Sequence, residues 1–330
     1  MTVRLTLSFI IAFLVSSGVG AFLVPWLRKI KAGQMIREDG PTWHMSKSGT
    51  PTMGGLMFIA ACVFVCLTVG FQSMLDGDYG HIFLLMFALI FGAIGFLDDD
   101  EKLKRKKNLG LLQLVAAMAF TYLLRRFGYV TPSLYIPFWN VNIPMSEPLY
   151  FLFCSFAVVS TVNAVNLTDG VDGLASGTSI PVCVFFGAVT FLWGEQYTTL
   201  GIFASALAGG LLGFLLYNYN PAKVFMGDTG SLFLGGAIVG MALMTNMPLI
   251  ILVLGFLFVL EALSDVIQVA YFKLSHGKRV FKMAPFHHHL ELGGWSGKKW
   301  SEKQLFALFT GISVLCAVIS FVGIYNRYGF

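Results

Sequence analysis

Long apolar runs alternate with short polar segments along almost the whole chain. About ten runs are long enough to cross a membrane, since a helical span needs roughly 20 mainly apolar residues. The runs do not alternate residue by residue as the strands of a membrane barrel do, so helices are predicted. We predict an all-α polytopic integral membrane protein with one transmembrane domain over residues 1–330. Its expected spans are 5–27, 52–71, 81–97, 109–124, 149–164, 177–193, 198–217, 230–245, 247–272 and 304–326.

The composition agrees with this interpretation. Of the 330 residues, 56% are hydrophobic and only 12% are charged, and the mean hydropathy is +0.76, whereas soluble proteins are about 25% charged. These values exclude a soluble globular enzyme, a disordered chain and a nucleic-acid-binding domain. The five cysteines lie in apolar runs and form no Cys-x-x-Cys pair, so no disulfide framework or zinc site is indicated. The first run lacks a clear cleavage site and is predicted to be a retained span.

Positive charge is distributed unequally between the loops. Most of the 22 lysines and arginines lie in every second loop, starting after the first run, and the exceptions are Arg4, Arg125, Arg126 and Arg327. Because positively charged loops remain in the cytoplasm, these loops are predicted to be cytoplasmic and both termini to lie outside. Anionic lipid or phosphate could use a minor part of this charge. The segments rich in Asp, Asn, Gly and His fall on the same side, which predicts a site at the cytoplasmic face.

Three consecutive carboxylates, Asp98 to Asp100, close the third apolar run. Consecutive helix residues point about 100° apart, so the three cannot share one task, and neighbouring like charges raise one another's pKa. The triplet fits a divalent-cation or proton-transfer site. It fits equally a solvated charge run balanced by the basic segment 102–107.

The segment between the fifth and sixth runs, residues 163–175, reads NAVNLTDGVDGLA. Its glycines allow close approach of the backbone to a ligand, while Asn and Asp are also common in simple turns. A turn alone does not explain so many polar groups at bilayer depth, where each must be satisfied. The amides of Asn163 and Asn166 and the carboxylates of Asp169 and Asp172 make the segment a candidate ligand site.

The segment between the seventh and eighth runs, residues 218–231, reads NYNPAKVFMGDTGS. Asp228 or Thr229 fits the N-cap of the following helix. A second interpretation adds an open helix N-terminus that attracts phosphate and a carboxylate for a hard cation. Phe225 offers a face for stacking on a base, or it serves packing alone.

A triplet of histidines, His287 to His289, lies in the long ninth loop before Leu290 and Glu291. The spacing and the lack of a cysteine partner do not fit a usual zinc site. The histidines fit hydrogen bonds to phosphate, or two surface histidines and one packed histidine.

Two further features are less specific. Lys47 precedes the string SGTPTMGG, which lacks a Walker motif and marks either a plain helix start or a contact with an anionic or carbonyl group. Glu261, Asp265 and Gln268 share one face of the ninth run, where they line a groove or bond a neighbouring helix.

Together these segments form an inventory rich in Asp, opened by glycine and flanked by lysine. Mg²⁺ prefers a few carboxylates plus the phosphate oxygens of a substrate, and phosphoryl transfer relies mainly on positioning and charge neutralisation. The residues alone therefore support the hypothesis of a membrane-embedded phosphoryl-transfer enzyme with a lipid partner.

The same segments resemble one family. Residues 47–55, 95–100, 163–175, 218–232 and 285–291 are similar to the motifs of the phospho-N-acetylmuramoyl-pentapeptide-transferases, and the resemblance runs over nearly the whole chain. It implies a single transmembrane catalytic domain of ten helices in the bacterial plasma membrane, a homodimer and dependence on Mg²⁺. The implied reaction transfers phospho-MurNAc-pentapeptide from UDP-MurNAc-pentapeptide to undecaprenyl phosphate, which gives lipid I and UMP.

The resemblance also implies catalytic roles. Asp98 and Asp99 match an acidic pair linked to catalysis, and Asp228 matches the carboxylate that binds Mg²⁺. We expect Asp98 to deprotonate or orient the lipid phosphate; direct transfer and a route through an aspartyl-phosphate both remain open. The expected catalytic set is Asp98, Asp99, Asp228, His287, His288 and His289.

Other matches concern the substrate. Phe225 matches a residue that stacks near the uracil of the nucleoside pocket, with Lys47 nearby, and Asn218 matches a polar group lining the site. The expected substrate-binding set is Lys47, Asn163, Asn166, Asp169, Gly170, Val171, Asp172, Asn218 and Phe225.

One departure and two alternatives accompany the resemblance. Family members carry a longer segment, including a lysine, where Leu112 directly follows Leu111 here; this fits a deletion or an omission of residues, and omission is favoured. Sister polyprenyl-phosphate sugar-1-phosphate transferases share the acidic motifs, but the triple histidine and PAKVFMGDTGSL favour the peptidoglycan family. A transporter with a midplane site fits less well, because the dense polar motifs lie at one membrane face.

Overall fold

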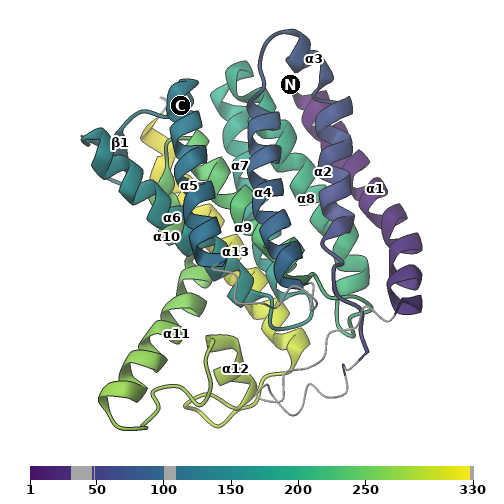
Figure 1. Ribbon diagram of the computed structural model, residues 1–330, viewed down its shortest axis with the longest axis vertical. Coiled ribbons are helices and arrows are strands. Elements are labelled where there is room, and N and C mark those ends of the chain that lie inside the picture. The colour runs from purple at the N-terminus through teal and green to yellow at the C-terminus, as the bar shows by residue number, and fades with distance from the viewer. Residues whose placement is uncertain (31–46, 48, 100–108, 328–330) are drawn as a thin grey trace.

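A computed structural model describes residues 1–30, 47, 49–99 and 109–327 of the chain. Helices form a bundle whose axes run roughly along one direction (Figure 1). The long helices are α1 (Thr2–Lys29), α4 (Gly80–Asp99), α5 (Leu109–Arg126), α6 (Glu147–Thr168), α7 (Leu174–Trp193), α8 (Thr198–Asn218), α9 (Gly227–Met244), α11 (Phe256–Leu274) and α13 (Glu302–Ile324). The shorter ones are α2 (Leu56–Thr68), α3 (Phe71–Leu75), α10 (Ile251–Leu254) and α12 (Phe286–Glu291).

The predicted all-α membrane architecture is confirmed. Within the described ranges, eight helices are long and apolar enough to cross a membrane, and a bent pair formed by residues 248–274 would be a ninth. The exception to the helical pattern is a small antiparallel hairpin between α5 and α6. Its strands, β1 (Ser133–Ile136) and β2 (Val141–Pro144), pair Ser133 with Pro144 and Ile136 with Val141.

The second predicted run is shorter as a helix than the sequence suggested. α2 has 13 residues, because the chain before it pairs with the α8–α9 loop instead of starting a helix. The amides of Gly54 and Gly55 donate to the carbonyls of Phe225 and Met226 at 2.8 and 3.0 Å. This pairing attaches the segment that follows Lys47 to the segment that precedes Asp228.

The prediction of one continuous span over 247–272 is wrong. The chain bends by 84° at Gly255, between α10 and α11, and α11 leaves the bundle (Figure 1). Two polar residues of α11 have their partners in the segment that follows it: Glu261 accepts from the backbone N–H of His287 on α12, and Gln268 accepts from the amides of Val280 and Phe281. Ionisable groups in spans normally face protein in this way.

Helix α9 forms the centre of the bundle and is almost entirely buried, whereas α1 and α13 each bury only 28% of their most apolar stretch. Large buried rings surround α9; Phe58 approaches Phe214 and Phe233 with ring centroids at 5.6 and 6.0 Å. Outward apolar side chains such as those of α1 suit contact with lipid. Because α9 is apolar on all sides, it can serve as the core of the bundle. Its first turn faces the candidate site.

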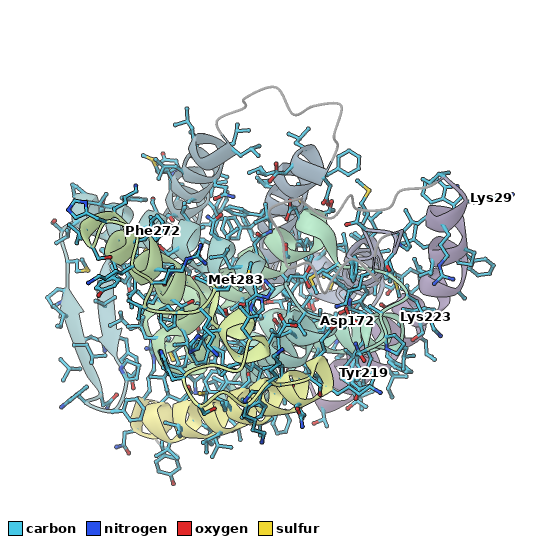
Figure 2. All side chains as sticks on the ribbon, turned by 90° about the horizontal axis from the view of Figure 1, so that it is seen from below. Lys29, Asp172, Tyr219, Lys223, Phe272 and Met283 are labelled. Atoms are coloured by element: carbon cyan, nitrogen blue, oxygen red, sulfur yellow. The ribbon has the colours of Figure 1, made fainter. Side chains whose placement is uncertain are left out.

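The two ends of the bundle differ in chemistry. The start of α1 and the end of α13 lie at the top in Figure 1, whereas α12 and the ends of α4 and α8 lie at the bottom. From below (Figure 2), Asp172 lies between Lys29 at the end of α1 and Phe272 on α11. Every described candidate motif therefore belongs to the end opposite the first and last helical residues.

Candidate functional site

Asp99, the last residue of α4, caps the N-terminus of α9. Its carboxylate accepts hydrogen bonds from the backbone N–H groups of Asp228 and Thr229 at 3.0 and 2.8 Å, and from the Thr229 hydroxyl at 2.6 Å. Helix N-termini leave such amides without partners, and the local N-cap, Met226, has no side-chain cap bond. The cap of α9 thus comes from another helix, not from Asp228 or Thr229 as one interpretation of the sequence had it.

Glycines make this contact possible. Gly227 has φ +74°, a left-handed conformation that favours glycine, and a Cβ there would lie 2.9 Å from the Asp99 carboxylate. A Cβ on Gly95 would overlap the backbone carbonyl of Asp228. The ends of α4 and α9 therefore approach closely only because neither position carries a side chain.

The cap leaves two carboxylates facing each other. Asp228 accepts a hydrogen bond from the Asn166 side chain at 2.7 Å, and the same amide donates to Ser231 at 2.8 Å. The Asp98 carboxyl lies within hydrogen-bonding reach of Asp228. No lysine or arginine pairs with Asp98 or Asp228 among the residues that the structure describes. Two close carboxylates without a cationic partner are a favourable place for a bound cation.

Asp169 adds a further carboxyl group to this cluster. It follows α6 directly, and its burial raises its pKa, an effect strengthened by Asp228, Asp99 and Asp172 and opposed by Lys47. The predicted convergence of acidic turns from distant segments is confirmed as geometry. We call Asp98, Asp99, Asn166, Asp169 and Asp228 the acidic centre.

A cavity of about 220 Å³ borders the acidic centre. Asp98, Asn163 and Asn166 line it together with Gln113, whose side-chain carbonyl accepts a hydrogen bond from Asn163 at 2.7 Å. The structure thus places Asn163 beside the acidic centre. Gln113 contributes a polar group that sequence reasoning did not single out.

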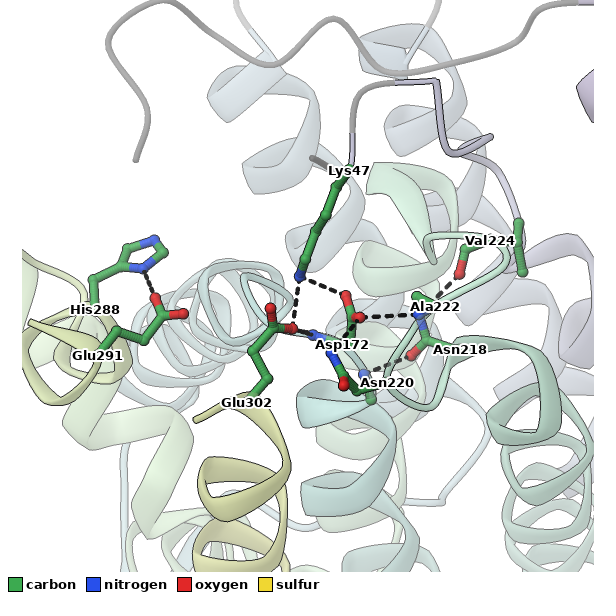
Figure 3. A network of polar contacts seen from close by, with 10 residues as sticks. Lys47, Asp172, Asn218, Asn220, Ala222, Val224, His288, Glu291 and Glu302 are labelled. Carbon is green, nitrogen blue, oxygen red and sulfur yellow. Dashed lines mark hydrogen bonds and ion pairs between the residues drawn. The ribbon is translucent and has the colours of Figure 1, made fainter. Parts of the chain in front are cut away.

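A second group, the lysine network, lies around Asp172 of the α6–α7 turn (Figure 3). The Lys47 ammonium bridges Asp172 at 2.7 Å and Glu302 at 2.6 Å. Asp172 is almost completely buried, and its second oxygen accepts from the Asn220 side chain and the Ala222 amide at 3.0 and 2.9 Å. Four segments far apart in the sequence therefore meet around Lys47 and Asp172.

The proposed nucleoside residues surround this network. The Lys47 ammonium lies 5.9 Å from the centroid of the Phe225 ring. Asn218 is buried and holds two loops together: its carbonyl accepts from the Gly173 amide, and its amide donates to the Val224 carbonyl. The Val171 side chain is buried in a small apolar cluster with Leu174 and Leu305, so only its backbone is available to a ligand.

The three histidines lie on α12 and have different partners. His287 is buried, and both its backbone N–H and its ring Nδ1 contact Glu261, the ring at 3.1 Å; its Nε2 points at Gly170, where a Cβ would overlap it. His288 pairs with Glu291 at 2.7 Å. His289 accepts from the Lys282 amide through Nδ1, and burial together with Lys282 lowers its pKa.

Glu302 and Asn220 are site residues that the sequence did not reveal. Glu302 is the first residue of α13, next to a Ser301–Gln304 capping box, and it looks like an ordinary helix start. Its partner Lys47 lies 255 positions away. No local signal marks such a contact.

The acidic centre does not supply a complete metal site from its side chains alone. Among the described residues, no three His, Cys, Asp or Glu side chains are arranged to hold an ion by themselves. Mg²⁺ differs from zinc in this respect, because it usually takes one or two carboxylates and completes its shell with water and phosphate. Asp228 and the facing Asp98 fit that mode.

Comparison with known proteins places the chain in a class and then in a family. Residues 81–246 match the model of glycosyl transferase family 4, so the chain is a multi-pass membrane protein of that class. Residues 47–59 match signature 1 of the phospho-N-acetylmuramoyl-pentapeptide-transferases. The chain belongs to the phospho-N-acetylmuramoyl-pentapeptide-transferase family, as the resemblance predicted.

Relatives of that name cover the chain almost completely. The transferase of Clostridium acetobutylicum is 43% identical over 325 residues, which are 96% of this chain and 98% of the relative. That of Listeria monocytogenes is 43% identical over 323 residues, 95% and 96% of the two chains. That of Clostridium botulinum is 44% identical over 321 residues, 96% and 95%.

The two neighbouring aspartates of α4 are expected to differ in stability effects. Asp99→Ala leaves two amides of α9 uncapped and should cost about 1–2 kcal/mol, whereas Asp98→Ala relieves repulsion and should leave the protein at least as stable as before. Asp99→Asn, which keeps one acceptor oxygen, should fall between them. Thermal unfolding of the detergent-solubilised variants, followed by tryptophan fluorescence, measures this order. Equal midpoints for the two alanine variants would contradict the capping assignment.

Proposed function

We propose that this protein transfers phospho-MurNAc-pentapeptide from UDP-MurNAc-pentapeptide to undecaprenyl phosphate, giving lipid I and UMP. The observation that carries the proposal is the pair of facing carboxylates, Asp98 and Asp228, at the capped N-terminus of α9. Family membership supports the choice of substrates. The cavity beside Asp98 supports the position of the acceptor phosphate.

The proposed reaction forms one bond to phosphorus and breaks another. An oxygen of the lipid phosphate forms a bond to the sugar-linked phosphorus, and the pyrophosphate bond breaks so that UMP leaves. Asp98 is suited to hold or remove the proton of the lipid phosphate, because its carboxylate is not used for capping. Asp99 positions Asp228 through the helix N-terminus and acts as a positioning residue in this scheme.

Mg²⁺ is the proposed cofactor. When bound, it would neutralise charge on the pyrophosphate and on the developing products. Asp228 would hold it, with Asp98 close by. Asn166 keeps the Asp228 carboxylate oriented through its 2.7 Å hydrogen bond.

Donor recognition is assigned to the lysine network. Phe225 offers an aromatic face near the Lys47 ammonium, a combination suited to a nucleobase. Lys47 is kept in place by two carboxylates. The backbone of the α6–α7 turn can approach a ligand closely, because Gly170 carries no side chain. His287 and His288 complete the site on the side of α12.

The proposal includes the membrane arrangement. We place the end of the bundle that carries the acidic centre at the cytoplasmic face, with about ten membrane helices once α2 and the bent pair are counted, and we propose a homodimer. The positive charge of the loops at this end supports the orientation.

Loss of the Asp228 charge should abolish the metal-dependent reaction. Asp228→Asn is expected to lower turnover on the order of 100-fold or more, the usual cost of removing a group that stabilises transferring charge, while Asp76→Asn at the exposed far end should match the wild type. The assay measures conversion of radiolabelled donor to a butanol-extractable lipid and release of UMP, with and without EDTA. Detergent removes all compartments, so UMP release also separates an enzyme from a transporter.

Three results would count against this proposal. They are wild-type turnover in Asp228→Asn, turnover unaffected by EDTA, and preference for UDP-GlcNAc over the muramoyl donor. The last would favour the sister sugar-1-phosphate transferases.

The orientation can be tested by cysteine labelling. All five native cysteines are buried, so an added surface cysteine gives the main signal. In intact cells a membrane-impermeant maleimide should label Glu195→Cys, whose side chain is 83% exposed, and should label Lys223→Cys only after the cells are opened. The reverse pattern would invert the topology.

A further inference from the structure

A cavity of about 830 Å³ lies between the lysine network and α12. Two of its lining residues connect it to groups already described: Glu302 contacts Lys47, and Glu291 contacts His288 (Figure 3). Its floor and rim come from Asn220, from the loop after α12 and from the first turn of α13. The volume lies within the range of pockets that take ligands larger than a single sugar. Nothing in the proposed transfer of the phosphoryl group uses it.

The charged residues that line the cavity are two lysines and two glutamates. Lys299 and Lys303 line it, and neither has a carboxylate partner in the described part of the chain. The two acidic residues of the lining, Glu291 and Glu302, already contact His288 and Lys47. A third ammonium, that of Lys298, lies 4.8 Å from the centroid of the Trp300 ring in the same wall. An anionic ligand with apolar parts would meet both cations and an aromatic surface here.

We propose that this cavity binds the peptide part of the donor, with Lys299 and Lys303 meeting peptide carboxylates. The inference rests on the proposed function, because the donor named there carries a pentapeptide. A muramoyl group is an acyl group, so it joins the peptide through the amino end and leaves a free carboxylate at the other end. Five extended residues reach at most about 17 Å.

The position of the cavity suits this occupant. It adjoins the lysine network, which is assigned to the nucleoside, and α12, whose His287 and His288 complete the proposed site. A donor held between them would therefore have its peptide near the opening. Asn220, Ser301 and Gln304 add amide and hydroxyl groups for peptide backbone. Exposed lysines also suit an anionic membrane surface. A hollow that combines cations, amides and an indole ring is better matched to a peptide than to a flat layer of headgroups.

The experiment compares two donors on one enzyme. They are UDP-MurNAc-pentapeptide and the same compound with its C-terminal carboxylate converted to an amide. The test variant is Lys299→Glu/Lys303→Glu. The matched control is Lys278→Glu, which changes an exposed lysine in the loop after α11, outside the cavity. KM and kcat are measured by UMP release in detergent, without and with added phosphatidylglycerol.

The double variant should raise KM for the carboxylate donor about tenfold, a size typical of two ion pairs replaced by repulsion, and should leave kcat within about twofold. The amidated donor should have a raised KM with the wild type and should be much less affected by the substitutions. The control should match the wild type with both donors. Higher salt should weaken the wild-type preference for the carboxylate.

Each contrary outcome has a separate meaning. Unchanged KM for both donors, or an equal loss with both, would overturn the peptide site, while turnover itself would still uphold the proposed function. If the double variant lost only its stimulation by phosphatidylglycerol and kept the preference for the carboxylate donor, the lysines would serve the membrane and the inference would be wrong. Absence of UMP release by the wild type from either donor would contradict the proposed function itself.

Discussion

The arrangement of the site depends on one interaction, the capping of α9 by the carboxylate of Asp99. Two backbone amides and the Thr229 hydroxyl converge on that carboxylate, which fixes the end of α4 against the start of α9. Asp228 and Asp98 then face each other, one on each helix. The Asp99 carboxylate is occupied by the hydrogen bonds of the cap, whereas that of Asp98 is not. The two neighbouring aspartates of α4 therefore have different tasks although they carry the same functional group.

The membrane environment explains the rest of the polar architecture. A buried carboxylate in or beside lipid needs a hydrogen-bonding partner. Glu261 on α11 has such a partner in His287 on α12. The same requirement links Asp172 to Lys47, to Asn220 and to the backbone of the α8–α9 loop. These contacts hold α12, the α6–α7 turn and the start of α13 together at one end of the bundle. The apolar packing around α9 does not by itself specify how these loops meet.

The sequence predicted the helical spans and most of the candidate residues, because apolar length and motif composition are local properties. It did not predict the break at Gly255, since the mean hydropathy of an apolar run contains no information about a bend within that run. It placed α2 too early, because the pairing of Gly54 and Gly55 with the α8–α9 loop is a tertiary effect. Glu302 was missed for the same reason: its chemistry depends on Lys47. The catalytic, substrate and metal roles of the candidate residues remain predictions.

Whether the Asp99 cap builds a cation site is measured by the binding of Mn²⁺, a paramagnetic substitute for Mg²⁺, followed by electron paramagnetic resonance in the presence of the donor. We expect Asp228→Asn to lose the bound signal. We expect Asp99→Ala, which removes the cap, to weaken binding by about tenfold or more, a loss typical when a group that orients a metal-binding side chain is removed. Binding of Mn²⁺ by Asp99→Ala as tight as by the wild type would show that the cap does not build the cation site.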